Sequence, residues 1–423
     1  MQNYKLTKAQ IIYYSLIALP LSIVGLPLYI YLPTYYATDV GINVTTVGLI
    51  LFIARITDVF TDPFFGYLSD KSVEYFNSRK PIMIIGSLIL IVSFYSIIKP
   101  NPIYAELWLL IFSITIYIGW SMINIPYLTW SSEISDKYED KTILNSSREL
   151  FTILGVLVAL IIPYLYEVSQ NSQKTLEILY LSFLILFFPF FLLTLKKIKI
   201  KETITSDKFN IKKIQLVYKN LADLKFLQIG YFLNNLANAL PATLFLLFIE
   251  LVIQEKSSSG MILILYFFSG VLALPFWNIL SNKIGKKKTW ISSILLASSV
   301  FIFVPFLESG DLLAFIIISL VSGLSLGADM ALPTAIQSDL VQKTKSFQNN
   351  ISGLLFGIWT MITKLSLAFA VALSFMVLGA FGFDASNPSS ESLVVLSLLY
   401  GLLPVCLKIL ALFFINKYAD LKA

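Results

Sequence analysis

Histidine is absent from the 423 residues, cysteine occurs once, and charged residues make up only 13% of the chain. The single cysteine, Cys406, excludes an internal disulfide, and the lack of imidazole excludes zinc and haem sites built on histidine. These two scarcities also remove most pairings of a nucleophile with a base, so we expect neither enzyme activity nor a cofactor. With 57% hydrophobic residues and a mean hydropathy of +0.80, the composition predicts a polytopic membrane protein.

Twelve apolar runs are long enough to be membrane spans, because a span needs about 20 apolar residues. We therefore expect an all-α protein with twelve transmembrane helices. The runs lie near residues 11–37, 44–68, 81–98, 103–130, 145–167, 175–195, 226–254, 259–280, 289–306, 311–338, 348–380 and 391–416.

The distribution of Lys and Arg predicts the orientation, since cytoplasmic loops accumulate positive charge. With both termini in the cytoplasm, the outer loops hold only Lys99, Lys174 and Lys256. The net charge of +6 then reflects topology and contact with anionic lipid, and we expect no nucleic-acid partner. We expect an integral protein of the cytoplasmic (inner) membrane.

Two weak internal repeats divide the chain in half. DPFFGYLSDK at 62–71 matches LPFWNILSNK at 274–283, and NIPYLTWSSEI from Asn124 matches ALPTAIQSDLV from Ala331 at nearly the same offset. Two related six-helix bundles are typical of a major facilitator architecture, in which the substrate binds near the midplane between the halves. We expect an N-terminal bundle over residues 1–195, a cytoplasmic connector over 196–225 and a C-terminal bundle over 226–423, and a monomer without a separate soluble domain.

The first repeat continues into a G-x-x-x-D-K…R-K pattern formed by Gly66, Asp70, Lys71 and Arg79. It resembles the loop motif of the major facilitator superfamily, which implies a gate that holds the cytoplasmic helix ends together in one state and releases them in the other. A cluster of positive-inside charges explains the lysines but not an acid at helical spacing from a glycine. Glu133 and Asp339 are further gate candidates.

The run at 44–68 carries Arg55, Asp58 and Asp62, spaced i, i+3 and i+7 on one helical face. A carboxylate at a helix centre costs about 2.5 to 3.5 kcal/mol, so two of them indicate a function. With the Thr61 hydroxyl they offer hard oxygen ligands for a monovalent metal ion such as sodium, or for a shared proton. Arg55 contributes to charge balance.

An opposite charge is expected from another span, and the candidates are Arg148, Lys364 and Lys408. Lys364 is the best placed, because it lies mid-span after Gly353 and Gly357, which allow helices to approach closely. An ammonium there balances the aspartates when the cation is absent. The alternative is a permanent salt bridge that only fixes two helices.

These residues also carry a family resemblance. R-I-T-D-V-F-T-D-P-F-F-G, N-I-P-Y with Arg148 downstream, and F-G-I-W-T-M-I-T-K-L resemble the glycoside-pentoside-hexuronide:cation symporter family of melibiose-permease-like transporters. The resemblance implies that Asp58 and Asp62 form the coupling-cation site, that Lys364 lies beside it, and that Arg148 lies by the substrate cavity. Melibiose-type permeases also bind sugar with acids on their first and fourth helices. Here residues 11–38 carry no charge and the fourth-helix position is Asn124.

A polar substrate needs donors and acceptors from facing helices, with apolar walls around them. Asparagine pairs also hold membrane helices together without binding a ligand, so Asn234 and Asn238 have two interpretations. The candidates for substrate binding are Ser121, Asn124, Arg148, Asn234, Asn238 and Thr360, with Trp120, Tyr127 and Trp359 as aromatic walls.

The sequence thus predicts a cation-coupled symporter that works by alternating access, with sodium or a proton as the coupling ion. A sugar, glycoside or sugar acid is the first expectation for the small-molecule substrate. A lysophospholipid-like amphiphile is the alternative, since animal relatives with similar acids carry such lipids and the sugar-type acids are missing.

Overall fold

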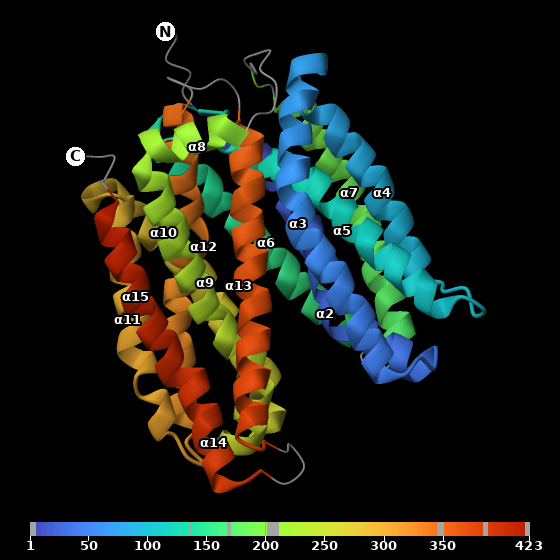
Figure 1. Cartoon of the computed structure of the whole chain (residues 1–423), viewed down its shortest axis with the longest axis vertical. Coiled ribbons are helices and arrows are strands. Elements are labelled where there is room, and N and C mark those ends of the chain that lie inside the picture. The colour runs from blue at the N-terminus through green and yellow to red at the C-terminus, as the bar shows by residue number, and fades with distance from the viewer. Residues whose placement is uncertain are drawn as a thin grey trace. The chain divides into compact units, whose positions relative to one another are not determined.

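The computed structural model describes residues 6–418, apart from 136, 167–170, 199, 201–210, 345–350 and 384–387. Every regular element within this part of the chain is a helix (Figure 1). Residues 199 and 201–210 of the expected connector at 196–225 lie outside the described residues, and its later part forms the helix α8 and the start of α9. The expected all-α fold is confirmed.

The helices follow the order that the apolar runs predict. The first half contains α1 (Lys8–Ser15), α2 (Ala18–Thr34), α3 (Val44–Phe76), α4 (Lys80–Ile98), α5 (Ala105–Trp130), α6 (Tyr138–Leu165) and α7 (Ser172–Lys197). The second half contains α8 (Ile211–Asn220), α9 (Ala222–Phe248), α10 (Ser259–Ile284), α11 (Lys286–Phe301), α12 (Leu312–Thr344), α13 (Ser352–Ala380), α14 (Ser390–Ser397) and α15 (Leu403–Lys417).

Length and hydropathy mark 11 helical segments in the described residues as candidate membrane spans. The helix α3 is not one of the 11, yet at 33 residues it is long enough to cross a bilayer and supplies the twelfth span. The repeated segments keep their prolines inside helices, with Pro63 in α3, Pro126 in α5, Pro275 in α10 and Pro333 in α12. Interior proline is tolerated in membrane helices because neighbouring groups satisfy the backbone carbonyl that it frees.

The chain divides into two compact units. The first unit comprises Met1–Asn210 together with Val341–Met361, and the second comprises Ile211–Leu340 together with Ile362–Ala423. The first turns of α13 therefore belong with the first unit, although they come from the second half of the sequence.

Each unit has its own apolar core. In the first unit α4 packs on α5 and α2 packs on α6 and α7, around buried aromatic residues such as Phe94 and Phe183. In the second unit α15 lies beside α9 and α11 (Figure 1), and the stacked rings of Phe248 and Tyr400 lie 4.3 Å apart. These cores hold rigid helices on which polar residues can be placed accurately.

Glycines allow α3 and the start of α13 to touch through their backbones within the first unit. A Cβ added to Gly353 would lie 2.6 Å from the carbonyl oxygen of Gly66, and one added to Gly357 would lie 2.5 Å from that of Asp62. Side chains do not fit at such distances, so the spacing of Gly353 and Gly357 serves close helix approach as the sequence indicated. The contacts also show that the two segments run antiparallel.

We expect Gly66→Ala to separate these segments, because the added methyl would overlap the Gly353 carbonyl. Overpacking of this kind costs about 1 to 3 kcal/mol. The matched control is Gly48→Ala on the same helix, where an added Cβ meets nothing within 4 Å. Thermal unfolding in detergent should show a lower midpoint for Gly66→Ala alone, and equal midpoints for the two variants would contradict the contact.

Candidate functional site

Asp58 and Asp62 lie together in the interior of the first unit. The hydroxyl of Ser121 on α5 donates to Asp62 Oδ1 at 2.8 Å and lies 3.3 Å from Asp58 Oδ1. One hydroxyl therefore bridges two carboxylates that are 4% and 0% exposed. The helix α3 packs along α5, which places Ser121 opposite the acidic face that the i, i+4 spacing of the two aspartates creates.

This arrangement of oxygen atoms suits a small monovalent cation or a proton. Two ionised carboxylates in apolar surroundings repel each other unless a positive charge joins them. Carboxylate and hydroxyl oxygens are hard ligands. The described residues contain no group of three or more His, Cys, Asp or Glu residues that could hold a metal ion.

The structure gives one contact for each of the two neighbours expected at this site. The Thr61 hydroxyl donates to the backbone carbonyl of Asp58 at 3.2 Å, a contact within its own helix. The Arg55 guanidinium is half-buried and lies 5.3 Å from the centre of the Tyr117 ring, a cation–π contact. Lys364 is 8% exposed and belongs to the second unit, so its pairing with the aspartates stays a prediction.

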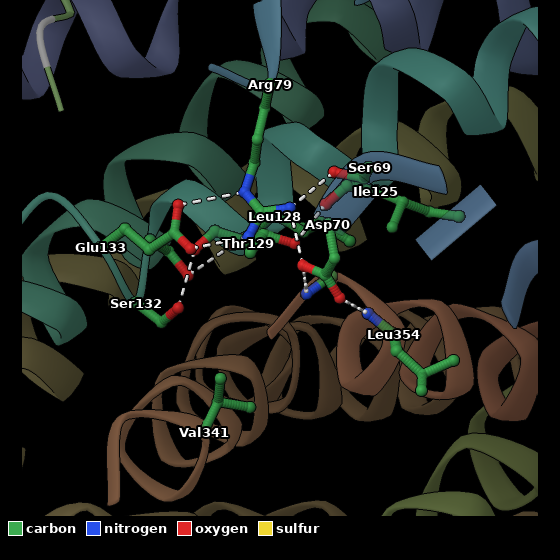
Figure 2. A network of polar contacts seen from close by, with 12 residues as sticks. Ser69, Asp70, Arg79, Ile125, Leu128, Thr129, Ser132, Glu133, Val341 and Leu354 are labelled. Atoms are coloured by element: carbon green, nitrogen blue, oxygen red, sulfur yellow. Dashed lines mark hydrogen bonds and ion pairs between the residues drawn. The ribbon is translucent and has the colours of Figure 1, made fainter. Parts of the chain in front are cut away.

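A second polar network surrounds Arg79, whose side chain is fully buried (Figure 2). Its guanidinium donates twice to Glu133, at 3.1 Å from Nε and 2.8 Å from Nη2. On the other side, Nη1 lies 2.8 Å from the Ser69 hydroxyl and 2.9 Å from Asp70 Oδ1. The bidentate geometry is specific to arginine, so Arg79 joins an acid of α3 to an acid in the turn that follows α5.

Asp70 extends this network to the N-terminus of α13. Its Oδ1 accepts from the backbone N–H of Gly353 at 2.8 Å, and its Oδ2 accepts from Leu354 at 2.9 Å (Figure 2). The first N–H groups of a helix have no partner within the helix, and their partial positive charge attracts a carboxylate. The contact between α3 and the start of α13 therefore includes four of the gate candidates: Gly66, Asp70, Arg79 and Glu133.

The other two gate candidates lie outside the Arg79 network. Lys71 pairs with Glu74 at 2.5 Å on the surface of α3. Asp339, in the second unit, pairs with Lys286 at 2.6 Å, and both side chains are buried. Lys286 belongs to the charged run that follows the second copy of the repeat, so each unit has a buried ion pair near its repeat.

Arg148 lies in a cluster with two tyrosines in the first unit. It pairs with Glu149, and the rings of Tyr14 and Tyr127 lie 4.8 Å apart. Arg148 Nη1 and the Tyr127 hydroxyl are buried and have no hydrogen-bond partner among the described residues. A buried donor without a hydrogen-bond partner costs about 1 to 3 kcal/mol.

The remaining substrate candidates of the first unit lie on two helices. Trp120 and Asn124 on α5 are half-buried, whereas Trp359 and Thr360 on α13 are buried. The Thr360 hydroxyl donates to the carbonyl of Gly357 at 3.0 Å, one turn back in its own helix. The helices α13 and α3 run antiparallel, with Gly353 beside Gly66 and Gly357 beside Asp62. Thr360, about one turn after Gly357, therefore lies near the turn of α3 that contains Asp58.

The second unit contains a polar cluster that sequence reasoning missed. Lys408 on α15 lies 3.1 Å from Asp329 on α12 and 3.0 Å from Asn234 on α9. Asp329 is a buried residue in the middle of α12. The sequence signal was two opposite charges, Asp329 and Lys408, within apolar runs. Their separation of 79 positions does not indicate that they form a pair.

A family model described as "MFS/sugar transport protein" matches residues 13–419. The symporter YnaJ of Bacillus subtilis (strain 168), described as uncharacterized, is 24% identical over 92% of this chain and 86% of its own length. A glucuronide carrier protein homolog of Escherichia coli (strain K12) is 19% identical, with coverage of 86% and 82%. The sodium-dependent lysophosphatidylcholine symporter 1 of Gallus gallus is 22% identical, with coverage of 96% and 85%.

Solved structures support the same architecture. A bacterial homologue of the iron transporter ferroportin, in an outward-facing state, matches with a TM-score of 0.72 and 12% identity over 98% of this chain and 99% of its own. The fucose:proton symporter of E. coli matches with a TM-score of 0.69 and 13% identity, with coverage of 98% and 100%. At such identities the likeness shows the fold alone, which is that of the major facilitator transporters.

Proposed function

The chain belongs to the family of MFS/sugar transport proteins, and on that premise we propose that it is a symporter that couples a cation gradient to the uptake of a small solute. It is an integral membrane transporter, and its relatives include several symporters. We propose that it has no catalytic activity. The observation that carries the proposal is the pair of buried carboxylates, Asp58 and Asp62, bridged by one hydroxyl.

In the proposed cycle the coupling ion binds at Asp58 and Asp62 and neutralises their repulsion. Ser121 holds both carboxylates at one point, so that a single cation or proton can interact with the two acids. Occupancy of this site favours the conformation that binds the solute, and linkage requires the solute to favour the ion equally. Lys364 serves as the counter-charge when the ion has left.

A sugar, glycoside or sugar acid is the proposed solute. Arg148 and Tyr127 provide buried N–H and O–H groups that suit hydroxyl or carboxylate oxygens. The glucuronide carrier homolog is consistent with such a substrate. A lysophospholipid-like amphiphile is the second candidate, favoured by the uncharged stretch at 11–38 and by the similarity to the avian lysophosphatidylcholine symporter.

The network of Asp70, Arg79 and Glu133 is the proposed cytoplasmic gate. Asp70 caps α13 through two backbone N–H groups, so loss of this contact would free the start of α13. A buried ion network of this kind is a bistable element, since its charges must be either paired or hydrated. We further propose that both termini face the cytoplasm, that the chain lies in the cytoplasmic membrane, and that it functions as a monomer.

The test is uptake into proteoliposomes that contain the full chain. A mixed pool of sugars, sugar acids and lysophospholipids is offered under an inward sodium gradient or an inward proton gradient, and the contents are read by mass spectrometry. Accumulation of one class under one gradient identifies both the solute and the ion. If neither gradient drives accumulation of any member of the pool, cation-coupled uptake of these solutes is refuted.

A further inference from the structure

The second unit buries an ion pair for which the proposed coupling mechanism has no use. Lys408 and Asp329 are 5% and 7% exposed, and they lie within the membrane spans α15 and α12. Charges at such a depth are costly and usually mark a functional site. Besides Lys408, Asp329 accepts hydrogen bonds from Trp290 Nε1 at 3.0 Å and from Asn238 Nδ2 at 3.1 Å.

These contacts use the carboxylate of Asp329 as the acceptor for an ammonium, an indole N–H and an amide N–H. The ion pair can therefore act on the side chains around it by orienting them.

The ion pair orients two amides of α9 in opposite senses. An ammonium has only donors, so it must face the carbonyl oxygen of Asn234, which lies 3.0 Å from Lys408 Nζ. An ionised carboxylate has only acceptors, so it must face the amino group of Asn238, at 3.1 Å. The orientation of both amides follows from the chemistry of their partners.

The consequence is a donor and an acceptor one turn apart on the same face of α9. Asn234 is left with its amide N–H groups, and its Nδ2 is buried with no acceptor among the described residues. Asn238 is half-buried and is left with its carbonyl oxygen as an acceptor. The unused donor of Asn234 is an independent sign of a ligand, because a buried N–H without an acceptor is costly.

We propose that the Asp329–Lys408 ion pair, by fixing the amides of Asn234 and Asn238, makes this turn of α9 a subsite for a neutral hydroxyl group of the transported solute. A hydroxyl can accept from Asn234 and donate to Asn238 at once. A carboxylate or phosphate has only acceptors and would face the Asn238 oxygen and the charge of Asp329. The inference rests on the proposed function and specifies a hydroxyl-bearing solute, whose acidic group, if it has one, binds elsewhere.

The experiment measures binding to the purified full chain in detergent with sodium present. The probes are D-glucose, D-galactose, D-xylose and D-glucuronate, followed by the monodeoxy analogues of whichever binds most tightly. In the wild-type chain, removal of one hydroxyl should weaken binding at least about tenfold, since it leaves the donor of Asn234 and the acceptor of Asn238 unpaired. In Asn234→Ala and in Asn238→Ala, the parent sugar and that analogue should bind equally.

The positioning role of the ion pair is tested with the double variant Asp329→Asn with Lys408→Met, which removes both charges together. It should lose the same discrimination between the parent sugar and the deoxy analogue. The matched control is Thr243→Ala, which removes a hydroxyl of α9 that donates to the Ala239 carbonyl of the same helix at 2.8 Å, and this variant should keep the discrimination. Discrimination that persists in both asparagine variants would show that the cluster only packs helices, whether or not the double variant folds.

Failure of the subsite can be told apart from failure of the proposed function. If no sugar of the panel binds, yet a sodium or proton gradient drives uptake of lysophosphatidylcholine into proteoliposomes, the hydroxyl subsite is overturned and symport stands. If no gradient affects the uptake of any panel sugar or of lysophosphatidylcholine, symport itself is overturned.

Discussion

Replacing Asp58 with asparagine should abolish gradient-driven accumulation of the solute while the protein still folds. The substitution keeps the volume and removes one of the two charges that Ser121 bridges. Coupling free energies of about 1 to 3 kcal/mol correspond to roughly 5- to 150-fold changes in affinity, so loss of the ion site removes an effect of that size. The concentration ratio across the proteoliposome membrane should fall to one, whereas equilibrating exchange of the solute persists.

The matched control is Glu74→Gln, which removes an acid from the same helix at a partly exposed position. It should accumulate solute like the wild type. Asp62→Asn should behave like Asp58→Asn, because both carboxylates share the hydroxyl of Ser121. Undiminished accumulation by both asparagine variants would refute the cation site.

Replacing Arg79 with alanine should release the start of α13 and strongly destabilise the protein. Arg79 is fully buried between Asp70 and Glu133, so its removal leaves two buried carboxylates without their counter-charge. Breaking a buried ion network in this way costs about 3 to 5 kcal/mol. Hydrogen exchange by mass spectrometry should show faster exchange in residues 352–356, and thermal unfolding should begin at a lower temperature.

Two further variants separate the network from a general effect of basic residues. Arg79→Lys keeps the charge but loses the bidentate contact with Glu133, so it should fall between the wild type and Arg79→Ala. Lys71→Ala removes a partly exposed pair with Glu74, and surface pairs contribute only about 0 to 1 kcal/mol. Equal exchange at residues 352–356 in Arg79→Ala and Lys71→Ala would contradict the gate contact.

Much of the cation site could be predicted from the sequence, because its two acids lie on one helix. The spacing of Asp58 and Asp62 fixes their common face through helical periodicity alone. The bridging Ser121 could not be assigned to them in this way. It lies 59 positions from Asp62, and the packing of α5 on α3 alone decides that its hydroxyl meets both carboxylates.

The gate motif was likewise only partly predictable from the sequence. The pattern of Gly66, Asp70 and Arg79 indicated a contact between helix ends, but it did not name the partner. That partner is the backbone of Gly353 and Leu354, which carries no sequence signal because every residue has an N–H group. The only sequence feature that indicated backbone N–H groups without a partner was the expected start of a helix after a loop.

The sequence by itself determined that the chain spans the membrane, that it repeats within itself, and which charges are too costly to be incidental. Hydrophobicity and helical periodicity are local properties, and both can be read along the chain. The tertiary structure alone decided the partners: Asp70 with the start of α13, Ser121 with the two aspartates, and Lys408 with Asp329 and Asn234. Partner choice depends on how helices far apart in sequence pack, and the free energy of a buried charge depends on that partner.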